Sequence, residues 1–337
     1  MGCKPPVNNG DDFNRSTLLI NWADNIIIPS YESYLSKVEG LEMRVAEFAL
    51  EPSEENLDEL RSSLFDAYKE WQTVQAFEFG PASNRALLET TNTYPTDTIA
   101  IVAAIGDEAW IPGTPSTLDN IGFPALDYLI NGFSLSEISP EAIDHIERLV
   151  DYLYAESYSV LESWETAYRD EFVESTGTEM GSSVGEVLNA FNHVYESSVR
   201  HQKLGLPSGV STFSQTPLPH LVEAPHAETW SVEFLKTSLD AFENIYLGSD
   251  GVGLDDYLIS LGETEYGAGL DADIKVQMES SKMALELLED PLATYVVDQQ
   301  SEAFEVYTEL QALVVLWKVD MMSSLGVLIT YQDNDGD

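Results

Sequence analysis

One aspartate lies in an otherwise apolar stretch of the chain. Residues 120–132 read NIGFPALDYLING, and Asp127 is their only charged side chain. Gly122 and Pro124 precede it in the order expected at a helix start, because proline is favoured in the first helical turn. There the helix dipole would favour the charge of Asp127, which could hydrogen-bond free backbone N–H groups or hold a cation. Both interpretations remain open from this segment alone.

Two further acidic residues stand where predicted helices end or begin. Glu78 follows Trp71 near the end of a predicted helix, which a Gly-Pro pair at 80–81 stops. Its carboxylate could be a ligand or part of the solvated surface. Asp97 lies in the turn YPTD, residues 94–97, and capping of the next helix is the simpler interpretation of its role.

A glutamate and a histidine stand three residues apart in the second half. Glu223 and His226 could share one helical face, as in carboxylate-bridged metal bundles. Pro225 lies between them and indicates a helix start, where the dipole disfavours a cation. The five histidines form no established zinc spacing, and the sequence contains no nucleophile elbow, phosphate-binding glycine loop or dinucleotide fingerprint.

The charge balance of the chain is strongly acidic. Asp and Glu number 59 against 15 Lys and Arg, which gives a formal net charge of -44. Nucleic-acid binding depends on Lys and Arg contacts to phosphate, so we expect no nucleic-acid partner. Most of these carboxylates are best interpreted as a solvated coat, although the field would also attract cations.

The first residues resemble the end of a bacterial lipoprotein signal. Gly2-Cys3 is followed by a polar spacer without hydrophobic periodicity, and Cys3 is the only cysteine. The N-myristoylation pattern fails, because Pro6 stands where Ser or Thr is required. We therefore predict a lipid anchor at Cys3 and a flexible tether over residues 1–12, the alternative being an accidental free cysteine. This places the protein in the bacterial cell envelope, on the periplasmic or outer-membrane surface.

Apolar residues recur at spacings of three and four through most of the chain, which predicts helices. In the first half these are residues 13–50, 53–78, 124–132 and 140–174, with a kink or break at Pro29. In the second half they are residues 184–204, 228–247, 270–288 and 304–328. No alternating run is long enough to indicate a sheet, so the fold class is all-α.

About four long amphipathic helices in each half are enough to close a bundle. We predict an N-terminal bundle over residues 13–178, a C-terminal bundle over 179–332 and an acidic tail over 333–337. A short echo hints at duplication, because Gly122 with Asp127-Tyr128-Leu129-Ile130 recurs as Gly251 with Asp256-Tyr257-Leu258-Ile259.

The order of several short motifs resembles the imelysin-like family, in the subset found as lipoproteins of Bacteroidetes. The resemblance covers nearly the whole chain. Its marks are PSY at 29–31, the segment from Trp71 to Gly80-Pro81, YPTD at 94–97, the segment 122–132, KLGLPSG at 203–209, Val222-Glu223 and LGVL at 325–328. It implies an all-helical fold of two bundle-like halves, an envelope location and a connection with iron uptake. The family is also classed as metallopeptidases.

The signature of that family, Gly-x-His-x-x-Glu, is degenerate here. It reads Gly122-Phe123-Pro124-Ala125-Leu126-Asp127, so a proline replaces the histidine and an aspartate replaces the glutamate. A zinc peptidase normally needs three protein ligands, and Pro124 has no side-chain lone pair. Asp127 could join Glu78, Asp97 or Glu223 in an all-oxygen site, which suits calcium or ferric iron.

We therefore expect a non-catalytic protein that binds a cation, an iron-containing ligand or an iron-uptake partner. Its expected ligand-binding residues are Gly122, Pro124, Asp127, Trp71, Glu78, Asp97 and Glu223. The alternatives are a metallopeptidase with a shifted ligand set and a surface module that binds another protein.

Overall fold

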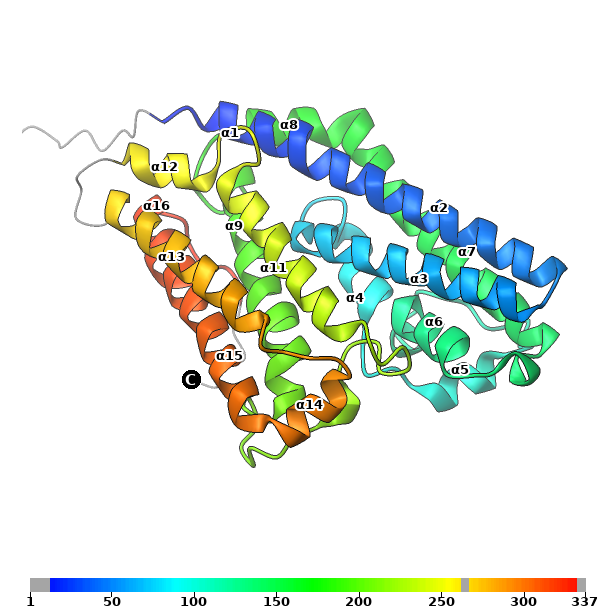
Figure 1. Ribbon diagram of the computed structural model, residues 1–337. Coiled ribbons are helices and arrows are strands. Elements are labelled where there is room, and N and C mark those ends of the chain that lie inside the picture. The colour runs from blue at the N-terminus through cyan, green and yellow to red at the C-terminus, as the bar shows by residue number, and fades with distance from the viewer. Residues whose placement is uncertain (1–12, 262–266, 332–337) are drawn as a thin grey trace, which may run out of the picture.

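The computed structural model describes residues 13–261 and 267–331, and all regular elements in these ranges are helical, as predicted (Figure 1). The first half contains α1 (Arg15–Asn21), α2 (Ile28–Leu50), α3 (Glu54–Val74), α4 (Leu87–Asn92), α5 (Thr98–Ala104), α6 (Gly122–Asn131), α7 (Pro140–Ser163) and α8 (Arg169–Glu174). The second contains α9 (Ser183–Val194), α10 (Leu206–Ser208), α11 (Ser231–Leu247), α12 (Leu254–Ser260), α13 (Gly267–Leu285), α14 (Leu292–Asp298), α15 (Gln300–Val314) and α16 (Met322–Leu325).

Helix α3 shows how local sequence and packing agree. Ser53 caps its start, since the Ser53 hydroxyl accepts a hydrogen bond from the Asn56 backbone N–H at 3.2 Å. Leu57, Leu60 and Leu64 recur on one face and are fully buried. That face packs against α2, and α3 also contacts α6 and α11. The helix therefore belongs to the first half but also touches the second.

The helices form two adjoining groups. In the first half α2 lies along α3 and α7, and in the second α13 packs against α11 and α15 (Figure 1). One continuous apolar core runs through both groups. The α3–α11 contact joins them, and the candidate site lies along this seam.

The chain stays helical across Pro29, so a break, one of the two expected outcomes, does not occur. It lies in the first turn of α2, directly after a π-helical segment, Trp22–Ile27. A proline is tolerated in a first turn because its missing N–H and fixed φ matter least there. Further π-helical segments occur at Trp164–Tyr168, Tyr195–Gly205 and Val315–Met321.

The duplication and the domain boundaries remain predictions. Helix α8 ends at Glu174 and α9 begins at Ser183, on either side of the predicted boundary. The echoed residues differ in environment, because Asp127 is fully buried whereas Asp256 is exposed and accepts a hydrogen bond from the Gly253 N–H. Cys3 and the 333–337 tail lie outside the described residues. Among the helices described, none is long and apolar enough to cross a bilayer.

Candidate functional site

The turn before α6 fixes where Asp127 lies. Gly122 has φ +73°, and a Cβ atom there would come 2.2 Å from the Thr91 carbonyl oxygen. Only glycine fits such a close approach in the left-handed region. The turn therefore presses the start of α6 against the end of α4, and all residues of α6 except Tyr128 and Asn131 are buried.

Asp127 is buried and links α6 to the loop that precedes α11 through hydrogen bonds. One carboxylate oxygen accepts a hydrogen bond from Asn131 Nδ2 at 2.9 Å, and the other accepts one from the His226 backbone N–H at 3.0 Å. Burial raises the pKa of Asp127 above its usual value, although both hydrogen bonds act in the opposite direction. The carboxylate does bind a backbone N–H group, but one that is 99 residues away in sequence.

Glu223 lies beside a buried lysine of the chain itself. The Lys203 ammonium contacts one Glu223 carboxylate oxygen and also donates to Gln72 Oε1 at 2.8 Å. The other Glu223 oxygen accepts from Asn92 Nδ2 at 2.8 Å and from Gln72 Nε2 at 3.2 Å. Lys203 and Glu223 are each only 1% exposed. Burial lowers the pKa of Lys203, while the Glu223 charge opposes this.

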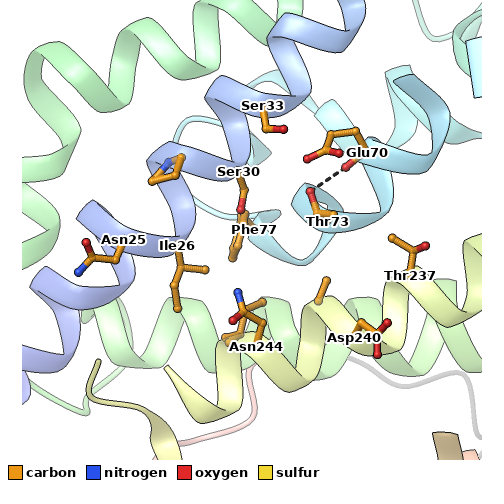
Figure 2. A pocket seen from close by; sticks show the side chains of 13 residues that line it. Asn25, Ile26, Ser30, Ser33, Glu70, Thr73, Phe77, Thr237, Asp240 and Asn244 are labelled. Carbon is orange, nitrogen blue, oxygen red and sulfur yellow. Dashed lines mark hydrogen bonds between the residues drawn. The ribbon is translucent and has the colours of Figure 1, made fainter. Parts of the chain in front are cut away.

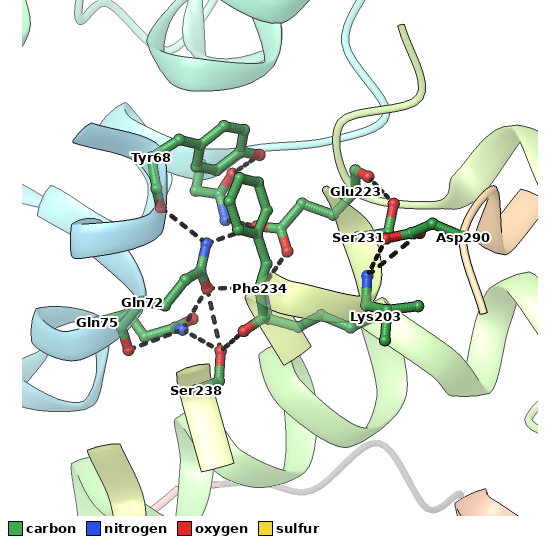
Figure 3. A network of polar contacts seen from close by, with 11 residues as sticks. Tyr68, Gln72, Gln75, Lys203, Glu223, Ser231, Phe234, Ser238 and Asp290 are labelled. Carbon is green, nitrogen blue, oxygen red and sulfur yellow. Dashed lines mark hydrogen bonds and ion pairs between the residues drawn. The ribbon is translucent and has the colours of Figure 1, made fainter. Parts of the chain in front are cut away.

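The network around this pair joins the two halves of the fold (Figure 3). Gln72 Oε1, on α3, accepts from Gln75 Nε2 at 2.7 Å and from the Ser238 hydroxyl of α11 at 3.1 Å. Asn92 Oδ1 accepts from the Tyr68 hydroxyl at 2.6 Å. Burial raises the pKa of Tyr68, and the charges of Glu223 and Asp127 raise it further, so the field of both carboxylates reaches this phenol. Asp127 also binds the main chain of His226, three residues after Glu223, so both carboxylates lie beside the same loop.

Three other predicted site residues have structural roles. Asp97 caps α5 at its start and accepts from the Ile99 and Ala100 N–H groups at 2.9 and 3.0 Å. Trp71 is a buried core residue whose ring centroid lies 5.6 Å from that of Tyr34. Pro124 is buried in the first turn of α6.

Glu78 lines a separate cavity of about 270 Å³, together with Glu186 and His193. Its carboxylate accepts a hydrogen bond from the Leu88 N–H at 3.0 Å. Burial raises the pKa of Glu78 to about 7, helped by the nearby Glu89 charge. The structure thus does not bring Glu78 together with Asp127 and Glu223.

Replacing Glu78 by glutamine should change how stability depends on pH. The folded pKa of about 7 exceeds the usual value of 4.5, so between these values the folded state binds more protons than the unfolded state. The contribution of Glu78 to the stability of the wild type should therefore fall as pH rises through this window and then level off. We expect Glu78→Gln to be more stable than wild type by about 3 kcal/mol at pH 8 and to lie within about 0.5 kcal/mol of it near pH 4.5. Urea unfolding at both pH values measures this.

The control for this prediction is Glu32→Gln, which changes an exposed carboxylate on α2. Its difference from wild type should stay within about 0.5 kcal/mol at both pH values. A Glu78→Gln protein whose advantage does not grow with pH would show that Glu78 titrates normally.

No group of three or more His, Cys, Asp or Glu side chains in residues 13–261 and 267–331 could hold a metal ion. Glu223 and His226 do not act as the predicted pair of metal ligands. The His226 ring instead packs edge-on against Tyr128, with the ring centroids 5.1 Å apart. The residues present do not fit a metal centre at Asp127 and Glu223, since the ammonium of Lys203 already neutralises Glu223.

Sequence reasoning missed Lys203, Gln72 and Asn92 as site residues. The one signal available was a lysine in an apolar segment of a chain with few cations, LGLPSG following Lys203. The π-helical segment Tyr195–Gly205 directs this lysine into the seam, and such a segment leaves no clear trace in apolar periodicity.

Comparisons with known proteins define the class. The sequence model of the Imelysin family, also described as peptidase M75, matches residues 27–317, so this chain belongs to the imelysin family. An imelysin-like protein from Psychrobacter arcticum 273-4 has a similar fold, with a TM-score of 0.74, 15% identity and coverage of 96% of this chain and 99% of that chain.

Two further similar proteins have names that refer to iron regulation. One is a crystal structure from Parabacteroides distasonis ATCC 8503, described as a "putative iron-regulated protein A precursor", with a TM-score of 0.72, 16% identity and coverage of 96% of this chain and 97% of that chain. The other is the iron-regulated protein A of Synechococcus elongatus, 23% identical over 146 residues. That match spans 43% of this chain and 39% of the relative, so it covers only part of both.

Proposed function

We propose that this imelysin-family chain is a non-catalytic binding protein of bacterial iron uptake, and that its ligand is an iron-containing compound rather than a bare metal ion. The observation that carries the proposal is the buried contact between Lys203 and Glu223. An internal ammonium takes the place that a metal would need beside this carboxylate. Pro124 offers no lone pair, and both Asp127 oxygens accept hydrogen bonds from the chain.

The link to iron rests on the relatives named for iron regulation and on family membership. The envelope location rests on the same relatives, one of them a precursor, and on the Gly2-Cys3 sequence. A lipid on Cys3 would hold the protein at a membrane surface. Mass spectrometry of the protein from its native membrane fraction, with Cys3→Ser as the comparison, tests this anchor.

The function is tested by pairing a binding assay with a proteolysis assay. Hemin and ferric citrate serve as iron-containing probes, titrated by calorimetry, and unfolded casein serves as the peptidase substrate. We expect saturable binding of one probe and no cleavage of casein that a chelator abolishes. Chelator-sensitive cleavage would instead establish the metallopeptidase. Failure of both assays, with recovery of an iron-uptake protein by cross-linking in cells, would favour a protein-interaction module.

A further inference from the structure

A second cavity lies on the seam between the halves, next to the buried network but distinct from it (Figure 2). Its volume is about 370 Å³, and its walls come from α2 with the preceding π-helical segment, from α3 and from α11. Cavities of this size at a junction between two packed groups of helices are common places for small ligands. None of the residues of the Glu223 network lines it.

Polar side chains from all three walls converge on this cavity without partners. Ser30 and Ser33 lie on α2, Glu70 on α3, and Thr237 and Asn244 on α11. None of these five side chains forms a hydrogen bond or ion pair with another residue in the described part of the chain. Ser30, Glu70 and Thr237 are half-buried, whereas Ser33 and Asn244 are exposed at the rim of the cavity.

Three helical serines elsewhere in the protein are bonded within their own helices. Ser157, Ser197 and Ser238 each donate to the carbonyl oxygen four residues earlier, at 2.7, 2.7 and 2.8 Å. The hydroxyl groups of Ser30 and Thr237 make no such bond. They therefore keep both donor and acceptor capacity for a ligand.

The charges around the cavity select the ligand class. Glu70 and Asp240 are its only charged lining residues, and no lysine, arginine or histidine lines it. Asp240 is partly neutralised by Lys282, at 2.8 Å, whereas Glu70 has no ion-pair partner among the described residues. The cavity therefore disfavours phosphate or carboxylate ligands and favours a positively charged group near Glu70.

The base of the cavity is apolar. Ile26, Phe77 and Ile245 line it, and each is no more than 2% exposed. Pro29 and Ala241 also line the cavity and are only half-buried, so a ligand that carries an apolar body beside its charge could cover them.

We infer that this cavity binds a small organic cation, a primary amine whose ammonium contacts Glu70 and whose apolar body lies against Pro29 and Ala241. The hydroxyl and amide groups of α2 and α11 would bind the remaining ammonium protons and any polar substituent. This inference does not rest on the proposed role in iron uptake.

Calorimetry with phenethylamine as the probe tests this site in the full chain at 0.15 M salt. 2-Phenylethanol has the same body without the charge and serves as the matched ligand control. We expect saturable 1:1 binding of the amine and binding of the alcohol that is weaker by about tenfold or more. Glu70→Gln, which keeps the shape and removes the charge, should weaken amine binding by a similar factor.

Two variants distinguish amine binding in this cavity from nonspecific attraction of the amine to the acidic surface. Ala241→Phe should abolish amine binding, because its ring fills the cavity without any change of charge. Glu59→Gln removes an equal charge from a groove between α2 and α3 that Asp66 also lines, and should leave amine binding unchanged. Absence of binding, equal binding of amine and alcohol, or equal losses in Glu70→Gln and Glu59→Gln would each overturn the inference. Circular dichroism and thermal unfolding confirm that each variant is folded.

Discussion

Replacement of Lys203 by methionine is expected to destabilise the fold by about 3–5 kcal/mol. Methionine keeps much of the side-chain volume but removes the ammonium, so Glu223 stays buried without its cation. Gln72 also loses one donor. Urea unfolding at pH 7, followed by tryptophan fluorescence, measures the loss.

The second partner provides the internal test of this prediction. In the double variant Lys203→Met with Glu223→Gln neither member of the pair carries a charge, and we expect at least half of the lost stability to return. Lys282→Met is the matched control, because Lys282 forms ion pairs with Asp240 and Glu243 at the surface and should cost less than about 1 kcal/mol. If Lys203→Met has a free energy of unfolding no lower than that of Lys282→Met, the buried pair contributes little to stability.

Replacement of Gly122 by alanine is expected to cost about 3 kcal/mol or more. Two effects add, because the residue has φ +73° and because the new Cβ would lie 2.2 Å from a backbone oxygen of Thr91. That oxygen belongs to the main chain of α4, so relief requires movement of α4 or α6. Such movement would also disturb the hydrogen bonds of Asp127.

Gly106→Ala separates the two effects. Gly106 has φ +75°, but a Cβ there would meet nothing within 4 Å. This variant should therefore cost only about 1 kcal/mol, from the backbone conformation alone. Equal losses in the two alanine variants, measured by urea unfolding, would mean that the contact between the Gly122 turn and α4 is not tight.

Much of the fold follows from local sequence. The all-α class and the long helices could be predicted because their apolar residues recur at helical spacing, as along α3 and α7. The π-helical segments could not, because one extra residue per turn barely alters that spacing. Short helices such as α12 and α14 were also missed, since seven residues give too little periodicity to separate them from loops.

The candidate site was predicted in part. Asp127 and Glu223 were singled out from sequence, and the structure shows Asp127 bound to the loop that carries Glu223. The ligand role predicted for them stays a prediction. Their partners were not found, because a hydrogen bond between Asp127 and the main chain of His226 depends on tertiary structure. The same holds for Lys203, whose partners Glu223 and Gln72 come from a loop and from a helix of the other half.

The most direct test of the central claim is calorimetric titration of ferric, calcium and zinc ions into the wild-type protein and into Asp127→Asn and Glu223→Gln. The claim is that Lys203, Asn131 and the His226 backbone satisfy these two carboxylates within the chain. It predicts that no ion binds at one equivalent in a manner lost in either variant. One ion bound per chain, released when Asp127 or Glu223 loses its charge, would contradict it.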